Sequence, residues 1–378
     1  MTSRLHVAAL FEYPVLNGAE HSWLANLPFL QEHGVRFTAI APDVGQLAES
    51  LTAANIEIVP FSCHDRRGQR RELEELRAEL GGALRRTGGD VLHANSLSMS
   101  RLAGPVAKAA NLPSLGHLRD IVTISHRAMS DVNLNRRILA VSAATLRWHI
   151  DAGLRPDIAN ILANGVDLQR FAPGRNSHDL LDELGLDHSC KIVGNVGQIG
   201  LRKAQDILLD AAEQLIQRYS GVHFVLVGQR NSDKQESLEF EQQLRRRVRR
   251  QPLRGRVHLL GRRRDVPELM RAFDVVVHSA RQEPLGRVLL EAAATGRPIV
   301  ATNVGGTSEI FPVDSAAAVL VPADDPLAIV QAVAPLLTDE SRRRRLGAAA
   351  RHRCEAAFGA ETAAGGLLKH YRELVGDQ

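Results

Sequence analysis

The hydrophobic pattern along the chain alternates between two kinds of segment. Short apolar runs rich in Val and Ile are separated by longer stretches in which apolar residues recur at helical spacing. This alternation is typical of a parallel sheet whose two faces are covered by helices. Two successive series of such runs occur, so the expected fold class is α/β with two parallel-sheet domains.

The individual runs predict the elements of each series. The first series predicts strands at Leu5–Leu10, Val35–Ile40, Ile56–Phe61, Val91–Ala94, Pro113–Gly116, Ile138–Ser142 and Ile158–Leu162. The second predicts strands at Ile192–Val196, His223–Val227, Val257–Leu260, Val275–His278, Ile299–Ala301 and Ala318–Val321. Helices are expected at Ala19–Glu32, Arg66–Arg86, Leu97–Ala110 and Ala360–Leu374, and the pattern allows the last to pack on either domain.

A segment without periodicity separates the two series. Residues 164–179 collect Asn, Gly, Pro and Ser, as a linker does. We place the domain boundary there, which gives an N-terminal domain of residues 1–170 and a C-terminal domain of residues 171–358.

Composition narrows the function classes. Aromatic residues make up only 4% of the chain, and the net charge is +4, so a nucleic-acid groove is disfavoured and phosphate ligands are permitted. The three cysteines lie far apart, which fits a reduced cytoplasm better than a disulfide framework. No apolar run is long enough to cross a bilayer, so membrane contact is expected to be peripheral at most. The many Ala and Arg residues point to a GC-rich bacterial genome.

Ligands of open parallel sheets bind beyond the carboxyl ends of the strands, so the loops there carry the candidate chemistry. Asn17-Gly18-Ala19-Glu20 follows the first strand and opens a helix, where free N–H groups attract a phosphate or a substrate oxygen. A plain turn with a helix cap explains that segment equally well. The second series opens with a glycine-rich loop from Gly197 to Lys203, whose Arg202 and Lys203 suit a diphosphate or, alternatively, extend into solvent.

The most informative segment runs from Arg281 to Gly296. It places Glu291 inside the apolar pattern of a predicted helix, where a carboxylate needs hydrogen-bond partners such as ribose hydroxyls. Glu283 lies in the preceding loop, and the N–H groups of Leu285, Gly286 and Arg287 at the helix start can hold phosphate. The alternative is that Glu291 caps neighbouring backbone.

In this context the segment resembles the Glu-x7-Glu signature of family-4 retaining glycosyltransferases of the GT-B fold. The resemblance covers nearly the whole chain. It includes Asn17 to Glu20, Val141-Ser142, Asn164 to Asp167 with Phe171, the Gly197 to Lys203 loop, Gly228, and Gly305 to Ile310. It implies two Rossmann-like domains facing each other across a cleft, with the C-terminal helix, residues 359–378, crossing back to the N-terminal domain.

The resemblance also implies roles for particular residues. In the C-terminal domain it implies that Glu291 binds the ribose hydroxyls and that Glu283 contacts the donor sugar. The diphosphate is implied to contact Lys203 and the backbone amides of Leu285, Gly286, Arg287 and Val288. The base is implied to lie near Gly228 and Arg262. In the N-terminal domain, Gly18 is implied beside the diphosphate and His117 beside the reacting sugar carbon. The acceptor is assigned to Asn17, Glu20 and Arg119. For His117 the alternative is a turn histidine bonded to nearby backbone.

Two positions depart from the family pattern. Gln198 stands where many members have an arginine that contacts the diphosphate, so Lys203 is alone there unless Arg202 or Arg287 supplies the second charge. Asn17 stands where many members have a glycine.

The expected function is that of a retaining hexosyltransferase, which moves a sugar from a nucleotide diphosphate to a hydroxyl of a small-molecule or glycan acceptor. UDP is the expected nucleotide, because it is the commonest one in the family. No cofactor is expected, and no Asp-x-Asp or other metal-ligand cluster stands out, so the mechanism is expected to be metal-independent. Same-face attack assisted by the donor phosphate is favoured. An epimerase or phosphorylase on the same scaffold, and a non-catalytic sugar-nucleotide sensor, stay open, as does the oligomeric state.

Overall fold

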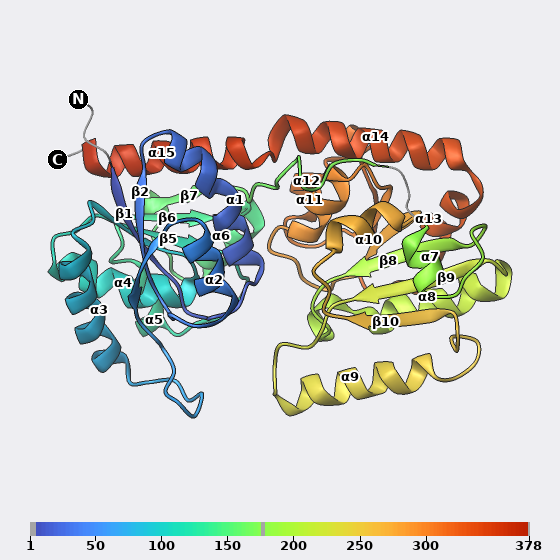
Figure 1. The fold of residues 1–378 in the computed structure, drawn as a ribbon, viewed down its shortest axis with the longest axis horizontal. Coiled ribbons are helices and arrows are strands. Elements are labelled where there is room, and N and C mark those ends of the chain that lie inside the picture. The colour runs from blue at the N-terminus through green and yellow to red at the C-terminus, as the bar shows by residue number, and fades with distance from the viewer. Residues whose placement is uncertain (1–4, 175–177, 377–378) are drawn as a thin grey trace. The chain divides into compact units, whose positions relative to one another are not determined.

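The computed structural model describes residues 5–174 and 178–376. It separates the chain into two compact units (Figure 1). The described residues up to Gly165, with those from Ala360 onward, form the N-terminal unit, and Val166–Gly359 forms the C-terminal unit. The boundaries predicted from the sequence, after 170 and after 358, lie within a few residues of these. The predicted linker includes residues 175–177, which lie outside the described residues.

The N-terminal unit is built on a parallel sheet of seven strands in the described part of the chain. Their order is β3-β2-β1-β4-β5-β6-β7, and all neighbours pair in parallel. The strands span His6–Leu10 (β1), Arg36–Ala41 (β2), Glu57–Pro60 (β3), Val91–Ala94 (β4), Ser114–Leu118 (β5), Arg137–Ala140 (β6) and Ala159–Ile161 (β7). Every residue of β1, β4 and β5 is buried, because helices cover both faces of the sheet.

All four helices predicted from the sequence are present in this unit, one of them with a different start. The helices span Gly18–Glu32 (α1), Gly45–Ala53 (α2), Leu73–Thr87 (α3), Leu97–Ala109 (α4), His126–Val132 (α5), Ala143–Asp151 (α6), the 3₁₀ turn Pro156–Ile158 and Ala360–Gly376 (α15). Of these, α2, α5 and α6 are additional to the predicted helices. The helix predicted from Arg66 begins only at Leu73. Asp65 accepts the N–H groups of Arg67 and Gln69, and this side-chain turn replaces the first helical turns.

The C-terminal helix α15 packs on the N-terminal unit, where it lies alongside α1 (Figure 1). Its residues Leu367, Leu368 and Tyr371 are buried in the same core as Trp23 of α1. The hydroxyl of Tyr371 is hydrogen-bonded to Nδ1 of His93 on β4, at 2.6 Å. The crossing of the last helix, implied by the family resemblance, is therefore confirmed, and the hydrophobic pattern alone left it undecided.

The C-terminal unit has a second parallel sheet, with order β10-β9-β8-β11-β12-β13 among the described residues. The strands span Lys191–Val196 (β8), Val222–Val227 (β9), Val257–Gly261 (β10), Val275–His278 (β11), Ile299–Thr302 (β12) and Val319–Val321 (β13). The helices span Asp179–Glu183 (α7), Gln205–Arg218 (α8), Gln235–Val248 (α9), Val266–Ala272 (α10), Arg287–Ala294 (α11), Thr307–Ile310 (α12), Pro326–Thr338 (α13) and Glu340–Ala357 (α14), with 3₁₀ turns at Leu201–Lys203 and Val313–Ser315. The two Rossmann-like sheets expected from the sequence are thus present.

The chain passes between the two units twice, and the two passages are hydrogen-bonded to each other. The N–H of Val166 donates to the carbonyl of Phe358 at 2.9 Å, and Val166 also pairs with Gly359. None of the helices in the described part of the chain combines the length and the hydropathy needed to cross a bilayer.

Candidate functional site

The glycine-rich loop after β8 lies against the end of β9. Gly197 and Gly228 both have positive φ angles, 154° and 143°. A Cβ on Gly228 would lie 1.9 Å from the carbonyl oxygen of Gly197, so only glycine allows these strand ends to approach so closely. A cavity of about 230 Å³ opens beside the loop, between Gln198–Lys203 and the start of α9 at Glu236 and Ser237.

The loop differs locally from the sequence-based expectation. Arg202 and Lys203 lie in a 3₁₀ turn, and α8 begins two residues after Lys203, once Ala204 has adopted a left-handed conformation. The two cations therefore precede the helix. Gln205 closes the loop on itself, because its amide donates to the carbonyl of Gln198 at 2.9 Å.

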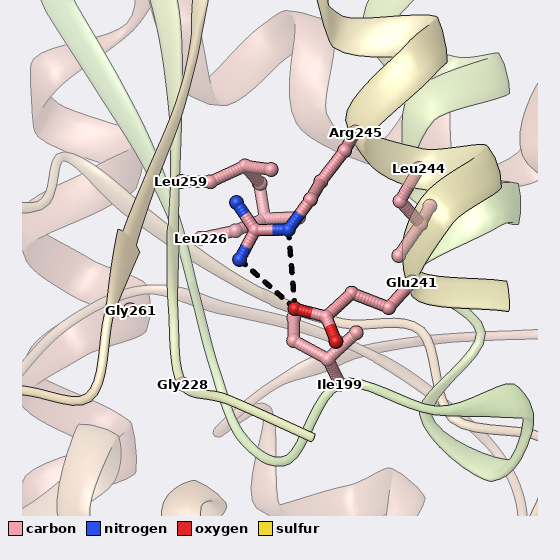
Figure 2. A pocket seen from close by; sticks show the side chains of 8 residues that line it. All are labelled: Ile199, Leu226, Gly228, Glu241, Leu244, Arg245, Leu259 and Gly261. Carbon is pink, nitrogen blue, oxygen red and sulfur yellow. Dashed lines mark hydrogen bonds and ion pairs between the residues drawn. The ribbon is translucent and has the colours of Figure 1, made fainter. Parts of the chain in front are cut away.

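A smaller hollow lies at the ends of β9 and β10, on the side of α9 (Figure 2). Leu226 and Leu259 point into it, and the ion pair between Arg245 and Glu241 lies across it, with Nη2 and Oε1 2.9 Å apart. Gly228 borders this hollow, near the position predicted for the nucleobase. Its enclosed space of about 20 Å³ takes about one water molecule, so the hollow is too small for a base. Arg262, also predicted beside the base, is exposed in the turn after β10.

Glu283 is the centre of a buried charge cluster at the carboxyl edge of this sheet. Its side chain is 7% exposed. Oε2 forms an ion pair with Nζ of Lys203 and lies 2.8 Å from Nε2 of His278, the last residue of β11. Burial alone would raise the pKa of Glu283, but Lys203 and the hydrogen bond from His278 hold that pKa well below its usual range. The carboxylate is therefore ionised in the donor-free protein.

The backbone around Glu283 is fixed from both sides. On one side, the hydroxyl of Ser279 donates to the carbonyls of Lys203 and Ala204, at 3.1 and 3.0 Å. On the other side, the N–H of Gly306 donates to the carbonyl of Glu283 at 3.0 Å. Gly305 has φ of 53°, and a Cβ there would lie 1.9 Å from the same carbonyl oxygen. The loop holding Glu283 is thus clamped between the glycine-rich loop and the loop after β12.

Glu291 lies about one turn into α11 and is 4% exposed. Its Oε1 forms an ion pair with Arg287, one turn earlier. The partner of this buried carboxylate is therefore a guanidinium and not the backbone cap that we considered. The helix begins at Arg287 after Gly286 in a left-handed conformation, so the N–H groups of Arg287 and Val288 have no acceptor within the helix, whereas those of Leu289 and Leu290 donate to the carbonyl of Gly286. Leu285 precedes this turn and is buried.

In the N-terminal unit, His117 lies inside β5 and not in a turn. It is 2% exposed, and its ring stacks on that of His93 with centroids 5.8 Å apart. Burial, reinforced by Arg119, lowers the pKa of His117 well below the ordinary value. Nη2 of Arg119 lies 3.1 Å from Nδ1 of His117, and because a guanidinium only donates, Nδ1 accepts and Nε2 carries the proton.

Three residues predicted to contact the acceptor already have structural partners. Arg119 donates to the side-chain oxygens of Asn95, at 3.0 Å, and of Asn164. Glu20 is buried and accepts the N–H of Asn17 at 2.9 Å, so it caps α1, and Gly18 is the first residue of that helix. Burial raises the pKa of Glu20. Contacts of Asn17, Glu20 and Arg119 with an acceptor stay predictions.

One member of the cluster, His278, was not predicted from the sequence. His278 lies within an apolar strand, where a histidine is usually an ordinary core residue, so no functional role was predicted for it. Its position directly before Ser279, at the end of a strand and five residues before Glu283, is the only signal that the sequence offers. Within the described ranges, 5–174 and 178–376, no group of three or more His, Cys, Asp or Glu side chains is arranged to hold a metal ion.

Comparison with known proteins gives a family for each unit. A family model described as Glycosyltransferase Family 4 matches residues 16–170, and one described as Glycosyl transferases group 1 matches residues 190–339. The lipopolysaccharide core mannosyltransferase LpsB of Rhizobium meliloti (strain 1021) is 31% identical over 221 residues, which is 58% of this chain and 62% of LpsB. This chain thus spans about three fifths of that relative.

Two further comparisons extend over almost all of the chain. A D-inositol 3-phosphate glycosyltransferase of Frankia alni (strain DSM 45986 / CECT 9034 / ACN14a) is 29% identical over 371 residues, 88% of this chain and 87% of the relative. The crystal structure of Anabaena HepE in complex with UDP-glucose superposes with a TM-score of 0.83 at 22% identity, covering 99% of this chain and 100% of that one, which establishes the GT-B fold. With a glycosyltransferase family model on each of its two sheets, the chain belongs to the family-4-like glycosyltransferases.

Proposed function

We propose that this protein is a retaining, metal-independent glycosyltransferase that moves a hexose from a nucleotide diphosphate sugar to an acceptor hydroxyl. The observation that carries the proposal is the buried cluster of Glu283, Lys203 and His278, which brings a carboxylate for sugar hydroxyls and a cation for phosphate to one point. UDP is the favoured nucleotide, supported by the UDP-glucose complex of the structural neighbour HepE.

Lys203 and Arg202 are the proposed contacts of the diphosphate. Arg287, the other candidate for the missing arginine at Gln198, is engaged by Glu291 in the donor-free protein. Arg202 contributes to the low pKa of Glu283, so its charge acts at the same point as that of Lys203. Together with the N–H groups of Arg287 and Val288 at the start of α11, these cations would stabilise the charge that develops on the leaving diphosphate.

Glu291 is the proposed contact of the ribose hydroxyls. Its ion pair with Arg287 makes burial of the carboxylate tolerable and leaves it acceptor-only, which is the form that two hydroxyl donors require. In the N-terminal unit, His117 offers a neutral ring with a proton on Nε2, suited to donate to a hydroxyl of the reacting sugar. We place the acceptor in the same unit and assign removal of its proton to a phosphate oxygen of the donor.

A thermal-shift screen with UDP-glucose, UDP-galactose, GDP-mannose and ADP-glucose tests the donor assignment, since a ligand that binds only the folded protein raises its melting temperature. We expect one of these compounds to raise it by several degrees, and Glu291→Ala to abolish that rise. The matched control is Glu268→Ala, an exposed carboxylate paired with Arg271 on the neighbouring helix α10. A melting temperature unmoved by every compound would remove the proposal.

The reaction type needs a separate measurement. With the preferred donor, turnover in the presence of EDTA and an α configuration of the new bond, read from the anomeric proton of the product of an α-configured donor, are expected for a metal-independent retaining enzyme. The names of the matched relatives include lipopolysaccharide core and D-inositol 3-phosphate transferases, so an acceptor panel should span lipid-linked sugars and inositol phosphates. Epimerised sugar or phosphate-dependent cleavage without acceptor would point to the alternative enzymes instead.

A further inference from the structure

His278 has a contact that its position in a hydrophobic strand does not require. Its side chain is 2% exposed, and Nε2 lies 2.8 Å from Oε2 of Glu283. An ionised carboxylate can only accept, so Nε2 carries the proton and donates it. Burial and the nearby Lys203 lower the pKa of His278, which keeps the ring neutral and adds no second buried cation beside Lys203.

Both donors of this cluster use the same oxygen of Glu283. Lys203 and His278 contact Oε2, and no residue in the described part of the chain donates to Oε1. Oε1 is thus available as the acceptor for a ligand hydroxyl. Under the proposed function, Glu283 and the diphosphate of the donor compete for the ammonium group of Lys203.

The two donors differ in mobility. Lys203 reaches Glu283 from a 3₁₀ turn through a flexible four-carbon chain. His278 extends from β11, where it pairs with Ala301 of β12, and its carbonyl accepts from the hydroxyl of Thr302 at 3.4 Å. A ring fixed to a central strand cannot follow a ligand, whereas a lysine side chain can.

The geometry points to His278 as the positioning residue of Glu283: it holds Oε2 in place when Lys203 turns to the diphosphate, so that Oε1 stays aimed at the donor sugar. This inference rests on the proposed function and adds a residue and a division of labour to it. Lys203 serves both the donor-free and the donor-bound protein, and His278 matters most once the sugar is bound.

The distinguishing experiment compares UDP with UDP-glucose by isothermal titration calorimetry. The quantity measured is the ratio of the two dissociation constants, because UDP lacks the sugar that Glu283 contacts. In His278→Leu, which removes the donor at similar volume, we expect UDP to bind within about threefold of wild type. The ratio of the dissociation constant of UDP to that of UDP-glucose should fall about tenfold, which corresponds to the loss of one charge-assisted hydrogen bond. In turnover, kcat should fall more than the KM of the acceptor rises.

Two variants separate positioning from a general loss of structure. His278→Gln keeps an N–H donor at a similar reach and should restore most of the ratio. His223→Leu removes another buried histidine of the same sheet, which is hydrogen-bonded to His258 at 3.1 Å near the amino end of β9, and should leave the ratio unchanged. If His278→Leu fails to fold, His278→Gln decides: a ratio as low as that of Glu283→Gln overturns the inference.

A double-mutant cycle completes the test. If His278 acts only through Glu283, then His278→Leu added to Glu283→Gln should lower the ratio no further. Additive losses, or an unchanged ratio in His278→Leu with intact UDP binding, overturn the positioning role and leave the proposed function standing. Failure of the wild-type protein to bind UDP and UDP-glucose would instead count against the proposed function.

Discussion

Two buried histidines at the carboxyl edges of the two sheets have opposite neighbours. His278 in the C-terminal unit donates to the carboxylate of Glu283, whereas His117 in the N-terminal unit accepts from the guanidinium of Arg119. Burial lowers the pKa of both rings, but Glu283 partly offsets the effect at His278 and Arg119 deepens it at His117. The same residue type therefore serves to hold a charged group in one unit and to present a neutral N–H in the other.

Under the proposed function, this difference gives the two units different tasks. The C-terminal cluster contains a cation and an anion whose charges cancel in the donor-free protein, and under the proposed function the diphosphate separates them. The N-terminal cluster combines Arg119 with neutral amide oxygens of Asn95 and Asn164, so it has hydrogen-bonding geometry without a counter-charge in those contacts. Substitutions in the first cluster should change donor binding, and those in the second should change turnover.

The largest effect is expected for Lys203→Met. It leaves the buried Glu283 with His278 as its remaining partner, and loss of one member of a buried ion pair typically costs about 3–5 kcal/mol. We expect a clear loss of unfolding free energy in urea and at least about a 100-fold weaker UDP-glucose affinity, about 2.7 kcal/mol. Lys191→Met, at the other end of β8 and paired with Asp274 at 3.3 Å, is the control and should leave donor affinity unchanged. Equal effects of the two variants would contradict a special role for Lys203.

A smaller and different effect is expected for Arg119→Leu. Removing the guanidinium relieves its repulsion of a protonated His117, so the pKa of His117 should rise, as an NMR titration of the ring would detect. We expect turnover to fall about 10- to 100-fold, less than the roughly 100- to 1,000-fold loss caused by removing an oxyanion-hole donor, while donor affinity stays within about threefold. Arg86→Gln, on the exposed last turn of α3, is the control. A donor affinity that falls as much as turnover would break the proposed division between the units.

His93 should make the unfolding free energy depend more steeply on pH than it would without this residue. Burial lowers the pKa of His93 to about 3, whereas the ordinary histidine value of 6.5 applies in the unfolded chain. The unfolded state alone then binds a proton between these pH values, so the stabilisation is complete above pH 6.5 and is lost as the pH falls toward 3. We expect His93→Gln to reduce the slope of unfolding free energy against pH by up to about 1.4 kcal/mol per pH unit below pH 6. His33→Gln, at the exposed end of α1, should leave the slope as it is.

The smallest effect is expected at the ion pair drawn in Figure 2. Arg245 is 56% exposed in its contact with Glu241, and exposed pairs of this kind contribute about 0.2–1 kcal/mol. Arg245→Gln should change the unfolding free energy by less than about 1 kcal/mol and leave UDP-glucose affinity unchanged. A loss of affinity comparable to that of Lys203→Met would show that the base lies in this hollow after all.

Much of the fold follows from local patterns. Every predicted strand overlaps an observed one, and Val91–Ala94 and Val275–His278 agree at both ends. Buried parallel strands are nearly continuous apolar runs, which makes them visible in a single sequence. The helix expected from Arg66 was wrong at its start, because the turn made by Asp65 and Gly68 competes locally with a charged helical pattern.

The candidate site was predictable in part for a similar reason. Glu283, Glu291 and Lys203 are charged residues in glycine-rich or apolar segments. A charged residue in such a segment can be recognised from the sequence alone. His278 does not stand out, because its partner comes from the following loop and only the folded backbone brings the two within 2.8 Å. The ion pair between Arg287 and Glu291 was likewise not visible in the sequence, and it is the contact that favours Arg202 in the proposed function.

The amino-acid sequence by itself determined the two parallel sheets, the approximate boundary between them and the residues that could carry charge at their edges. These features are predictable because buried strands and amphipathic helices each leave a local hydrophobic pattern in the sequence. Only the tertiary structure decided which charges meet, which histidine holds Glu283, and that the last helix returns to the N-terminal unit. These depend on side chains brought together by strand order and loop closure across tens to hundreds of residues, and such long-range contacts leave no periodic mark in the sequence.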